Sequence, residues 1–272
     1  MKEKKAITKP MIQAAIIVAI FYAFEVVFVY CDLFPNREIL WTVDSLLRIA
    51  LGTVGLFLLK KHADAGESKF TVKELFTNKI PPKTWILLIP FIITCLLPFV
   101  NIFTANYFTT EFIVALCILI FQQFATGYFE EGVQRGLIMN GLIMHRTETV
   151  KQRIFTVVIT GAFFGLGHLP IVVFGENPLI QVPHCLMVGM FWAAIYMLSD
   201  NLLLLMLLHA ISDSTPRIMG YLFNYPHDSV VCKVADYLGD AIDYVVLPLV
   251  AIYICVHFDK LKNYVTNRKR EN

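Results

Sequence analysis

Charged residues are scarce in this chain of 272 residues: they make up 16% of the sequence, whereas 57% of it is hydrophobic. The mean hydropathy is +0.64. In a soluble globular domain about a quarter of the residues are charged. A net charge of only +2 also gives no broad basic surface for nucleic acid. The composition therefore argues against a soluble enzyme or a nucleic-acid-binding protein, and it predicts an all-α, polytopic membrane protein.

The sequence signatures of common hydrolases and metal centres are also absent. There is no H-E-x-x-H helix of a zinc peptidase and no G-x-S-x-G turn of a serine hydrolase. The six cysteines have no C-x-x-C spacing, which argues against a zinc knuckle or a redox pair. Most of them are expected to be small packing residues, with a disulfide between Cys31 and Cys232 as the less favoured alternative.

Apolar runs of about twenty residues, the length that crosses roughly 30 Å of hydrocarbon, occur eight times. They cover residues 11–31, 39–59, 84–104, 111–130, 154–174, 184–198, 202–216 and 236–257. The last four are less clearly separated, because only Ser199, Asp200 and Asn201 divide two short runs. About eight transmembrane helices are expected, in one integral-membrane domain of residues 1–272.

The distribution of lysine and arginine tests this count, since short cytoplasmic loops collect positive charge. With the N-terminus inside, eighteen of these residues fall in cytoplasmic segments, and only Arg37, Arg217 and Lys233 fall in outer loops. An even number of spans is therefore predicted, with both termini in the cytoplasm and the chain in the plasma membrane. The loop of residues 60–83 is expected to form either a short interfacial helix or a solvated connector.

Several charged residues lie inside the spans, although a charge at the bilayer centre costs roughly 2.5 to 3.5 kcal/mol. Arg48 follows Asp44 by four residues, so these two are predicted to form an internal ion pair. No partner is predicted for Glu25, which lies in the first span. The remaining polar residues fall into three groups in the second half of the chain.

The first group is Glu130-Glu131 with Arg135. Glu131 and Arg135 are four residues apart, so Arg135 can neutralise and orient Glu131. Glu130 points about 100° away, has no cation on its own helix and is free to act as a base toward water. Residues 137–144 are again apolar, which predicts that the helix continues to about His145. The alternative is that the group only marks the cytoplasmic end of a span.

The second group is Phe164 with His168. The phenyl ring lies one helical turn before the imidazole and can hold its orientation. Gly161, Gly165 and Gly167 give the same helix a thin surface that a neighbour or a substrate can approach. Taken alone, a histidine within a span is as typical of interhelical hydrogen bonding as of catalysis.

The third group is His209 with Asp213, again four residues apart. A carboxylate in that position can fix the tautomer of a working imidazole. The alternative is a private pair that stabilises a single helix. Because three such groups occur in separate apolar spans, one shared polar pocket explains them more economically than three independent pairs.

In their order and spacing, these groups resemble the CAAX prenyl protease and bacteriocin-processing family of intramembrane proteases, also called the CPBP or Abi family. Its motifs E-E-x-x-x-R-G, F-x-x-x-H and H-x-x-x-N/D occur here as Glu130–Gly136, Phe164–His168 and His209–Asp213. The resemblance covers about residues 110–215. It implies about eight helices that enclose a polar cavity open to the cytoplasm, and hydrolysis of a peptide bond close to the membrane.

The resemblance also implies roles for individual residues. The catalytic positions are Glu130, Glu131, His168, His209 and Asp213, and the supporting positions are Arg135 and Phe164. In this assignment Glu130 activates water with His168, and Glu131 with Arg135 supports the site. His209 and Asp213 occupy the positions for oxyanion stabilisation or metal binding.

Two mechanisms stay open at this point. In one, Glu130, His168 and His209 bind a zinc ion and leave its fourth position for water. In the other no cofactor takes part: Glu130 is the general base and the imidazoles polarise the scissile carbonyl. Asp213 stands where the family often has asparagine, and an ionised carboxylate cannot donate a hydrogen bond to an oxyanion. This departure slightly favours cation binding or orientation of the histidine.

The substrate class is a further implication of the resemblance. It is a membrane-associated peptide or protein, such as a CAAX-type tail with or without a prenyl group, a pheromone or a bacteriocin-like peptide. Some members of the family confer bacteriocin immunity. The competing hypothesis is a non-proteolytic membrane protein, either an immunity or regulatory scaffold or an ion or proton pathway that uses the same polar residues. No internal repeat typical of transporters is present.

Overall fold

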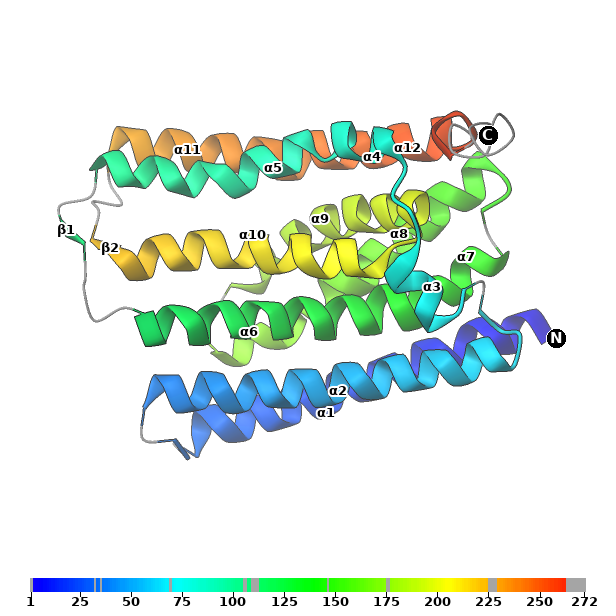
Figure 1. The fold of residues 1–272 in the computed structure, drawn as a ribbon, viewed down its shortest axis with the longest axis horizontal. Coiled ribbons are helices and arrows are strands. Elements are labelled where there is room, and N and C mark those ends of the chain that lie inside the picture. Colours follow the sequence, from blue (N-terminus) through cyan, green and yellow to red (C-terminus); the bar gives the residue numbers. More distant parts are fainter. Residues whose placement is uncertain are drawn as a thin grey trace.

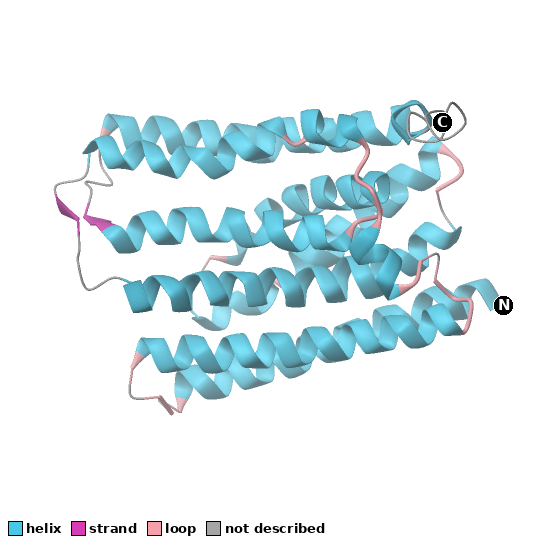
Figure 2. Cartoon of the chain, viewed as in Figure 1, coloured by secondary structure: helices cyan, strands magenta, loops and turns pink. Residues whose placement is uncertain are grey.

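The chain folds into a bundle of helices that run along one common direction (Figure 1). The computed structural model describes residues 2–31, 33–34, 36–68, 70–104, 107–108, 113–145, 147–174, 177–224 and 229–262. Apart from two short strands, the regular structure in these residues is helical (Figure 2), which confirms the all-α prediction.

The first half of the bundle comprises the following elements in chain order. They are α1 (Lys2–Tyr30), α2 (Arg37–Asp64), α3 (Val72–Thr77), α4 (Pro82–Leu87), α5 (Ile89–Leu96), the 3-10 helix η1 (Leu97–Thr104), β1 (Tyr107–Phe108), α6 (Ile113–Glu131), the π-helix η2 (Gly132–Met139) and α7 (Asn140–His145). The helix that begins at Ile113 thus continues to His145, as its apolar pattern predicts.

The second half contains α8 (Val150–Gly167), the 3-10 helix η3 (Leu169–Phe174), α9 (Pro178–Ser199), α10 (Leu202–Leu222), β2 (Phe223–Asn224), α11 (Val230–Ala241), the π-helix η4 (Ile242–Val246) and α12 (Leu247–Lys262). The strands β1 and β2 pair antiparallel, with Tyr107 opposite Asn224. In Figure 1 they lie at the end of the bundle opposite the start of α1 and the end of α12.

Polar residues set the boundaries of several helices. The side chain of Asn36 accepts a hydrogen bond of 2.9 Å from the backbone N–H of Ile39, so α2 begins there. Thr149 and Gln152 form a capping box at the start of α8. α9 ends at Ser199 and is followed by Asp200, whose φ of 49° is left-handed, and the chain enters α10 at Leu202. The short link predicted between these two helices is therefore confirmed.

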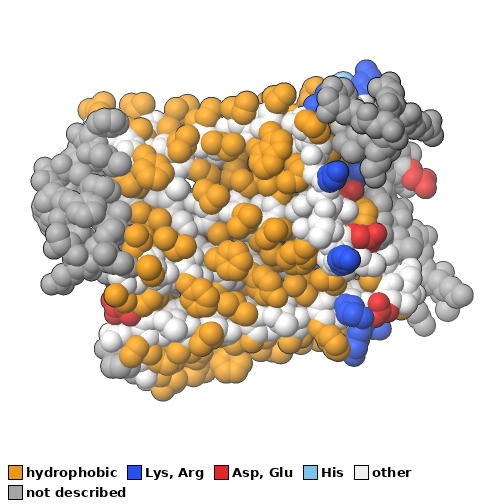
Figure 3. All heavy atoms as spheres, viewed as in Figure 1, with side chains coloured by type: hydrophobic (Ala, Val, Ile, Leu, Met, Phe, Trp, Pro, Cys, Tyr) orange, Lys and Arg blue, Asp and Glu red, His pale blue; other side chains and the backbone are white. Residues whose placement is uncertain are grey.

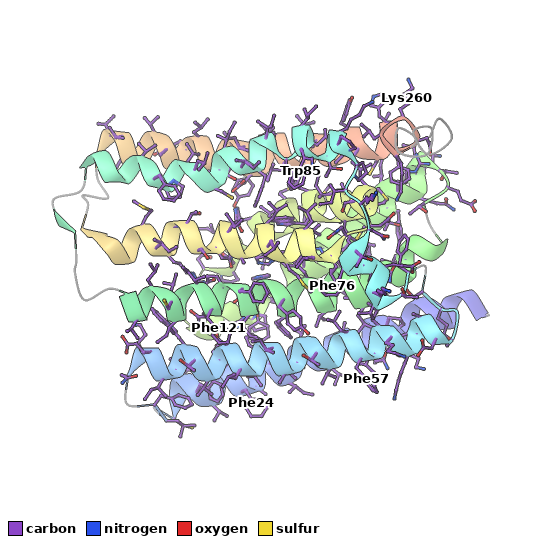
Figure 4. All side chains as sticks on the ribbon, viewed as in Figure 1. Phe24, Phe57, Phe76, Trp85, Phe121 and Lys260 are labelled. Carbon is purple, nitrogen blue, oxygen red and sulfur yellow. The ribbon has the colours of Figure 1, made fainter. Side chains whose placement is uncertain are left out.

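The outer surface of the bundle is apolar over most of its length. Figure 3 shows hydrophobic side chains covering the visible face, with lysine, arginine and acidic residues gathered mainly at one end. Phe24, Phe57 and Trp85 are labelled in Figure 4 and point away from the bundle, and each is close to half exposed. In water such a surface would be costly, whereas hydrocarbon solvates it. The chain is therefore a multi-pass membrane protein.

Five helical segments within the described residues are long and apolar enough to cross a membrane. They are Lys9–Phe28, Arg37–Asp64, Pro178–Ser199, Leu202–Met219 and Val230–Lys262. The shorter segment Ile89–Val100 is also apolar. Each of the eight predicted runs coincides with a helical segment, but α6 and α8 are not among the five. Eight crossings therefore stay a prediction.

The helices α8 and α9 pack closely through glycines, as the thin surface of α8 predicts. A methyl group on Gly161 would lie 2.8 Å from the carbonyl oxygen of Leu186, and one on Gly165 would lie 2.7 Å from that of Val182. On the facing helix, Gly189 would be crowded in the same way by Phe164. Gly167 has a looser environment. The missing side chains bring the backbones of α8 and α9 together.

The loop between α2 and α4 contains the short helix α3, which favours the helical alternative for this region. Leu75 of α3 is fully buried, so this helix packs on the bundle. The side chain of Asn78 donates to the carbonyl of Asp200, and the side chain of Asn201 donates to the carbonyl of Asn78. All six cysteines lie in the described residues and none of them forms a disulfide, so the alternative of a disulfide between Cys31 and Cys232 is wrong.

Candidate active site

Glu131, the last residue of α6, contacts both Arg135 of the first predicted group and His209 of the third. Its Oε1 accepts a hydrogen bond of 3.0 Å from Nη1 of Arg135 and lies 2.8 Å from Nδ1 of His209. Both carboxylate and guanidinium are completely buried. The ion pair expected from the four-residue spacing is therefore present, and it also reaches a histidine on α10.

Arg135 lies in the π-helix η2 and packs against the residues that hold the two histidines. Its Nη2 donates to the carbonyl oxygen of Gly189 at 3.2 Å, and its guanidinium lies 4.6 Å from the centre of the Phe164 ring. π-helical turns are rare and often occur at functional sites. Through Glu131, Phe164 and Gly189, the arginine thereby contacts α6, α8 and α9.

His168 caps the C-terminal end of α8. Its Nδ1 lies 2.8 Å from the carbonyl oxygen of Phe164. Since a carbonyl only accepts hydrogen bonds, Nδ1 carries the proton and Nε2 is left to face the cavity. The Phe164 ring contacts the imidazole edge-on, with 4.9 Å between ring centres. The predicted packing of Phe164 on His168 is thus confirmed, with a backbone hydrogen bond in addition.

His209 is held from two sides. Glu131 accepts the hydrogen bond from its Nδ1, and the ring of Trp192 stacks on the imidazole at 6.1 Å with an angle of 18°. Its Nε2 therefore faces the cavity, as that of His168 does. The sequence suggested Asp213 as the carboxylate that fixes this tautomer, but Asp213 Oδ2 lies 3.7 Å from Nε2. Glu131 takes the orienting position because it reaches Nδ1 from the neighbouring helix.

Glu130 lies at the centre of these residues. Its Oε2 is 3.8 Å from Nε2 of His168 and 3.7 Å from Nε2 of His209. This oxygen is buried and has no hydrogen-bond partner, which is uncommon for a carboxylate. The residues of all three predicted groups are therefore brought together, with Asp213 at the edge of the cluster.

A further charged residue, Arg48 of α2, reaches Glu130. Its Nη1 lies 3.8 Å from Glu130 Oε1, while its Nε donates to both oxygens of Asp44 at 2.9 Å. Asp44 also accepts a hydrogen bond of 3.0 Å from Gln122 and is hydrogen-bonded to the side chain of Glu25. The predicted ion pair of Asp44 and Arg48 is confirmed.

The contact between Arg48 and Glu130 is not predicted from the sequence. Only the presence of an arginine within a span pointed to a special role for this residue. No local spacing indicates which residue on another helix it meets.

Glu130, His168 and His209 are the donors that the sequence suggests for a metal ion. Among the described residues no three histidine, cysteine, aspartate or glutamate side chains are arranged to hold a metal ion. Glu130, His168 and His209 converge, but the separations of 3.7 and 3.8 Å are wider than the roughly 3.3 Å between ligands of a tetrahedral zinc ion. These three side chains, as placed, do not fit a zinc site, and no catalytic step is assigned to a metal.

The cluster forms the wall of a cavity of about 380 Å³. Helices α5, α6, α8, α9 and α10 and the π-helix η4 surround it. Besides Glu130, His168, His209 and Asp213, its lining includes Phe91, Thr94, Cys95, Pro98, Phe164, Gln181, His184, Cys185, Val188, Trp192, Ser212, Thr215, Pro216, Arg217 and Asp243. A cavity of this size accommodates several residues of a peptide in extended form.

A comparison with protein families identifies a match for the part of the chain that carries this cluster. Residues 111–215 match a family described as type II CAAX prenyl endopeptidase Rce1-like. These residues include α6, η2, α7, α8 and α9 and most of α10, and they contain every predicted site residue. The resemblance to this group of proteases is therefore confirmed over that segment. No curated protein and no solved structure matches the chain.

Proposed function

Since residues 111–215 match the Rce1-like endopeptidases, CAAX-type intramembrane endopeptidase activity is supported in general, and we propose that Glu130 supplies the catalytic base. The substrate is a membrane-associated peptide or protein, and the reaction is hydrolysis of one of its peptide bonds. The observation that carries this proposal is the buried, unpartnered Glu130 Oε2, which faces Nε2 of both His168 and His209.

The first step is the deprotonation of water. A water oxygen between the three polar atoms donates one proton to Glu130 Oε2 and the other to the lone pair of His168 Nε2 in a hydrogen bond. As the proton moves to Glu130, the oxygen attacks the scissile carbonyl carbon. Arg48, whose Nη1 lies 3.8 Å from the other oxygen of Glu130, keeps this carboxylate oriented.

His209 stabilises the oxyanion that forms. When its imidazole is protonated, Nδ1–H donates to Glu131 and Nε2–H donates to the oxygen that gains negative charge. Asp213 Oδ2 lies 3.7 Å from Nε2 and does not occupy the donor position. Glu130 then passes its proton to the leaving nitrogen and the C–N bond breaks. The hydroxyl proton that is hydrogen-bonded to His168 moves to Nε2, so the products are a carboxylate and an amine.

Arg135, Glu131 and Phe164 hold the two catalytic histidines in position. Arg135 neutralises Glu131, and Glu131 orients His209. Phe164 orients His168 through its carbonyl and its ring. Because these partners are buried and come from different helices, the relative positions of Glu130 and the two imidazoles depend on the packing of the whole core.

The test is turnover of a panel of fluorogenic peptides, with and without a C-terminal prenyl group, by the purified protein in detergent. We expect Glu130→Gln and His168→Ala to abolish cleavage, because they remove the base and its partner. Glu148→Gln, a change of an exposed glutamate at the start of α8, is the matched control and should retain activity. Full turnover in Glu130→Gln would contradict the proposal.

The same assay distinguishes the alternatives. If turnover is lost in a chelator and restored by zinc, the metal version with Glu130, His168 and His209 as ligands is favoured. A proton pathway is the alternative from another class, and the adjacent carboxyls of Glu25 and Asp44 are the observation in its favour. Proton flux into liposomes, without cleavage of any peptide, would support that function instead.

The resemblance and the charge distribution carry two further proposals. The protein resides in the plasma membrane with both termini in the cytoplasm, because most lysines and arginines fall on that side. Its substrates are peptides of the pheromone, bacteriocin or CAAX type, with or without a prenyl group. The peptide panel tests the second of these proposals directly.

A further inference from the structure

Helices α1 and α2, which lie outside the family match, reach the proposed catalytic base. Both precede residue 111, where the matching segment begins. α2 packs closely on α6: a methyl group on Gly52 would lie 2.8 Å from the ring of Tyr128 and 3.1 Å from the Cα of Phe129. The hydroxyl oxygens of Thr53 and Tyr128 are 3.1 Å apart and hydrogen-bonded. These contacts hold α2 against the turn of α6 that precedes Glu130.

One face of α1 meets the guanidinium of Arg48. Phe21 and Glu25 are four residues apart and therefore project from the same face of α1. The central guanidinium carbon of Arg48 lies 4.3 Å from the centre of the Phe21 ring, which is a cation–π contact. The same ring packs on that of Phe129, with 5.0 Å between the ring centres. α1 thus covers Arg48 where this residue approaches Glu130.

The carboxyl of Glu25 joins this arrangement through Asp44. Asp44 is buried and accepts hydrogen bonds from Nε of Arg48 and from Nε2 of Gln122. The side chain of Glu25 is also hydrogen-bonded to Asp44. An ionised carboxylate only accepts hydrogen bonds, so one member of this carboxyl pair carries a proton. Because Asp44 already accepts from Arg48 and Gln122, the proton belongs to Glu25, which is the donor to Asp44.

The proton on Glu25 determines the charge around Arg48. With Glu25 neutral, the guanidinium faces two carboxylates, those of Asp44 and Glu130. An ionised Glu25 adds a third negative charge on the side of Asp44. This charge attracts the guanidinium away from Glu130, whose Oε1 lies 3.8 Å from Nη1 of Arg48. A neutral donor at position 25 therefore keeps Arg48 between Asp44 and Glu130.

We propose that Glu25 is a positioning residue for catalysis, which acts through Asp44 and Arg48 on the orientation of Glu130. The inference rests on the proposed function, because it concerns the base of that reaction. It gives a role to Glu25, for which the sequence predicts no partner. A protonated carboxyl is also less costly than a carboxylate within an apolar span.

Turnover of a peptide that the purified protein cleaves tests this role. Glu25→Leu keeps a side chain of similar size but removes the donor, and kcat should fall roughly 10-fold with little change in KM. Glu25→Gln retains a neutral donor and should restore turnover. Phe24→Ala changes a neighbouring side chain that points away from the bundle (Figure 4), and this matched control should have wild-type kinetics. Wild-type kcat in Glu25→Leu, or an equal loss in Glu25→Gln, would overturn the proposal.

A double variant separates an effect through Arg48 from a general loss of packing. If Glu25 acts through Arg48, the variant that combines Glu25→Leu with Arg48→Lys should be no slower than Arg48→Lys alone. Two losses that multiply would show that Glu25 acts by another route, contrary to the proposal. Glu25→Ala takes the place of Glu25→Leu in the cycle if the latter does not accumulate.

The pH dependence of kcat reports on the proton itself. The charged groups that act on Glu25 among the described residues are Asp44 and Arg48, and Tyr22 is a further titratable side chain that interacts with it. As the pH rises, Glu25 loses its proton and Arg48 is attracted away from Glu130, so kcat of the wild type should fall reversibly at alkaline pH. In Glu25→Gln the amide cannot ionise, and this fall should be absent. The same alkaline fall in both proteins would contradict the role of the proton.

Infrared spectroscopy tests the protonation without turnover. The wild type at neutral pH should show the C=O stretching band of a protonated carboxyl that is missing in Glu25→Gln, and identical spectra in this region would refute the inference. If the band is present but no peptide is ever cut, the proposed function fails while the assignment of the proton stands. If Glu130→Gln is inactive but Glu25→Leu is unimpaired, the proposed function stands and the positioning role of Glu25 fails.

Discussion

At the level of single residues, two consecutive glutamates have different environments. Glu131 is completely buried and is shared by Arg135 and His209, whereas Glu130 lines the cavity and approaches Nε2 of both His168 and His209. The helical angle between neighbours predicts that they diverge. It does not predict that Glu131 orients His209, because that contact joins residues 78 positions apart. Local spacing indicates pairs within a helix, and packing decides pairs between helices.

Removal of the charge of Glu131 should destabilise the fold. Glu131→Gln leaves the buried guanidinium of Arg135 without its counter-ion, which costs about 3 to 5 kcal/mol. The matched control is Asp64→Asn, which breaks the exposed pair of Lys60 and Asp64 with the same four-residue spacing. An exposed pair of this kind contributes about 0 to 1 kcal/mol. The free energy of unfolding in mixed micelles measures both, and equal losses would contradict this account.

Arg48 should act on catalysis through Glu130. Arg48→Lys retains a charge beside Asp44, but an ammonium group cannot bind Asp44 and approach Glu130 at the same time. We expect kcat to fall roughly 10- to 100-fold with little change in KM, because the base is less well oriented. Arg37→Lys, at the exposed start of the same helix, should have wild-type kinetics. A rise in KM with unchanged kcat would show that Arg48 contacts substrate instead.

At the level of helices, the contact of α8 with α9 determines where His168 lies. The sequence predicts the thin glycine surface of α8, and the structure fills it with the backbone of α9. Neither the π-helical turns at Gly132–Met139 nor those at Ile242–Val246 are predicted, because they depend on tertiary packing rather than on composition. Helix boundaries with capping residues, such as Thr149 and Gln152, are more accessible to prediction.

A methyl group on this surface should separate the two helices. Gly165→Ala places a carbon 2.7 Å from the carbonyl oxygen of Val182, which forces a shift and costs about 1 to 3 kcal/mol. His168 follows within one turn, so turnover should fall as well. Gly167→Ala meets only Gln134, at 3.7 Å, and serves as the control. Thermal unfolding in detergent and peptide turnover report the two effects, and similar values for both variants would contradict the packing argument.

At the level of the whole molecule, hydropathy and charge predicted the class of fold better than the details of its spans. The eight predicted runs all coincide with helices, because the need to cover hydrocarbon sets their length and composition. Five helical segments are apolar enough to cross by themselves. α8 carries Lys151 and Arg153 in its first turn, which lowers the mean hydropathy of this helix.

The number of crossings can be measured with reporter fusions. If all eight runs cross, reporters inserted after Gly66 and after Glu148 should lie on the cytoplasmic side, together with both termini. A reporter inserted after Asn36 should lie on the opposite side and is the control for reporter activity. Because the argument depends on parity, a crossing number of five would place the two termini on opposite sides of the membrane.

The burial of Arg135 and Glu131 also has a consequence for synthesis. α6 emerges from the ribosome with its charged pair, yet His209 follows Glu131 by 78 residues. At 5 to 20 residues per second, roughly 4 to 16 seconds pass before that histidine is made. During this interval the pair has neither its final partner nor the cover of α9 and α10. Lipid alone is a poor environment for a charged pair. Until the later helices enclose this pair, it therefore has to be in contact with α2, the insertion machinery or water.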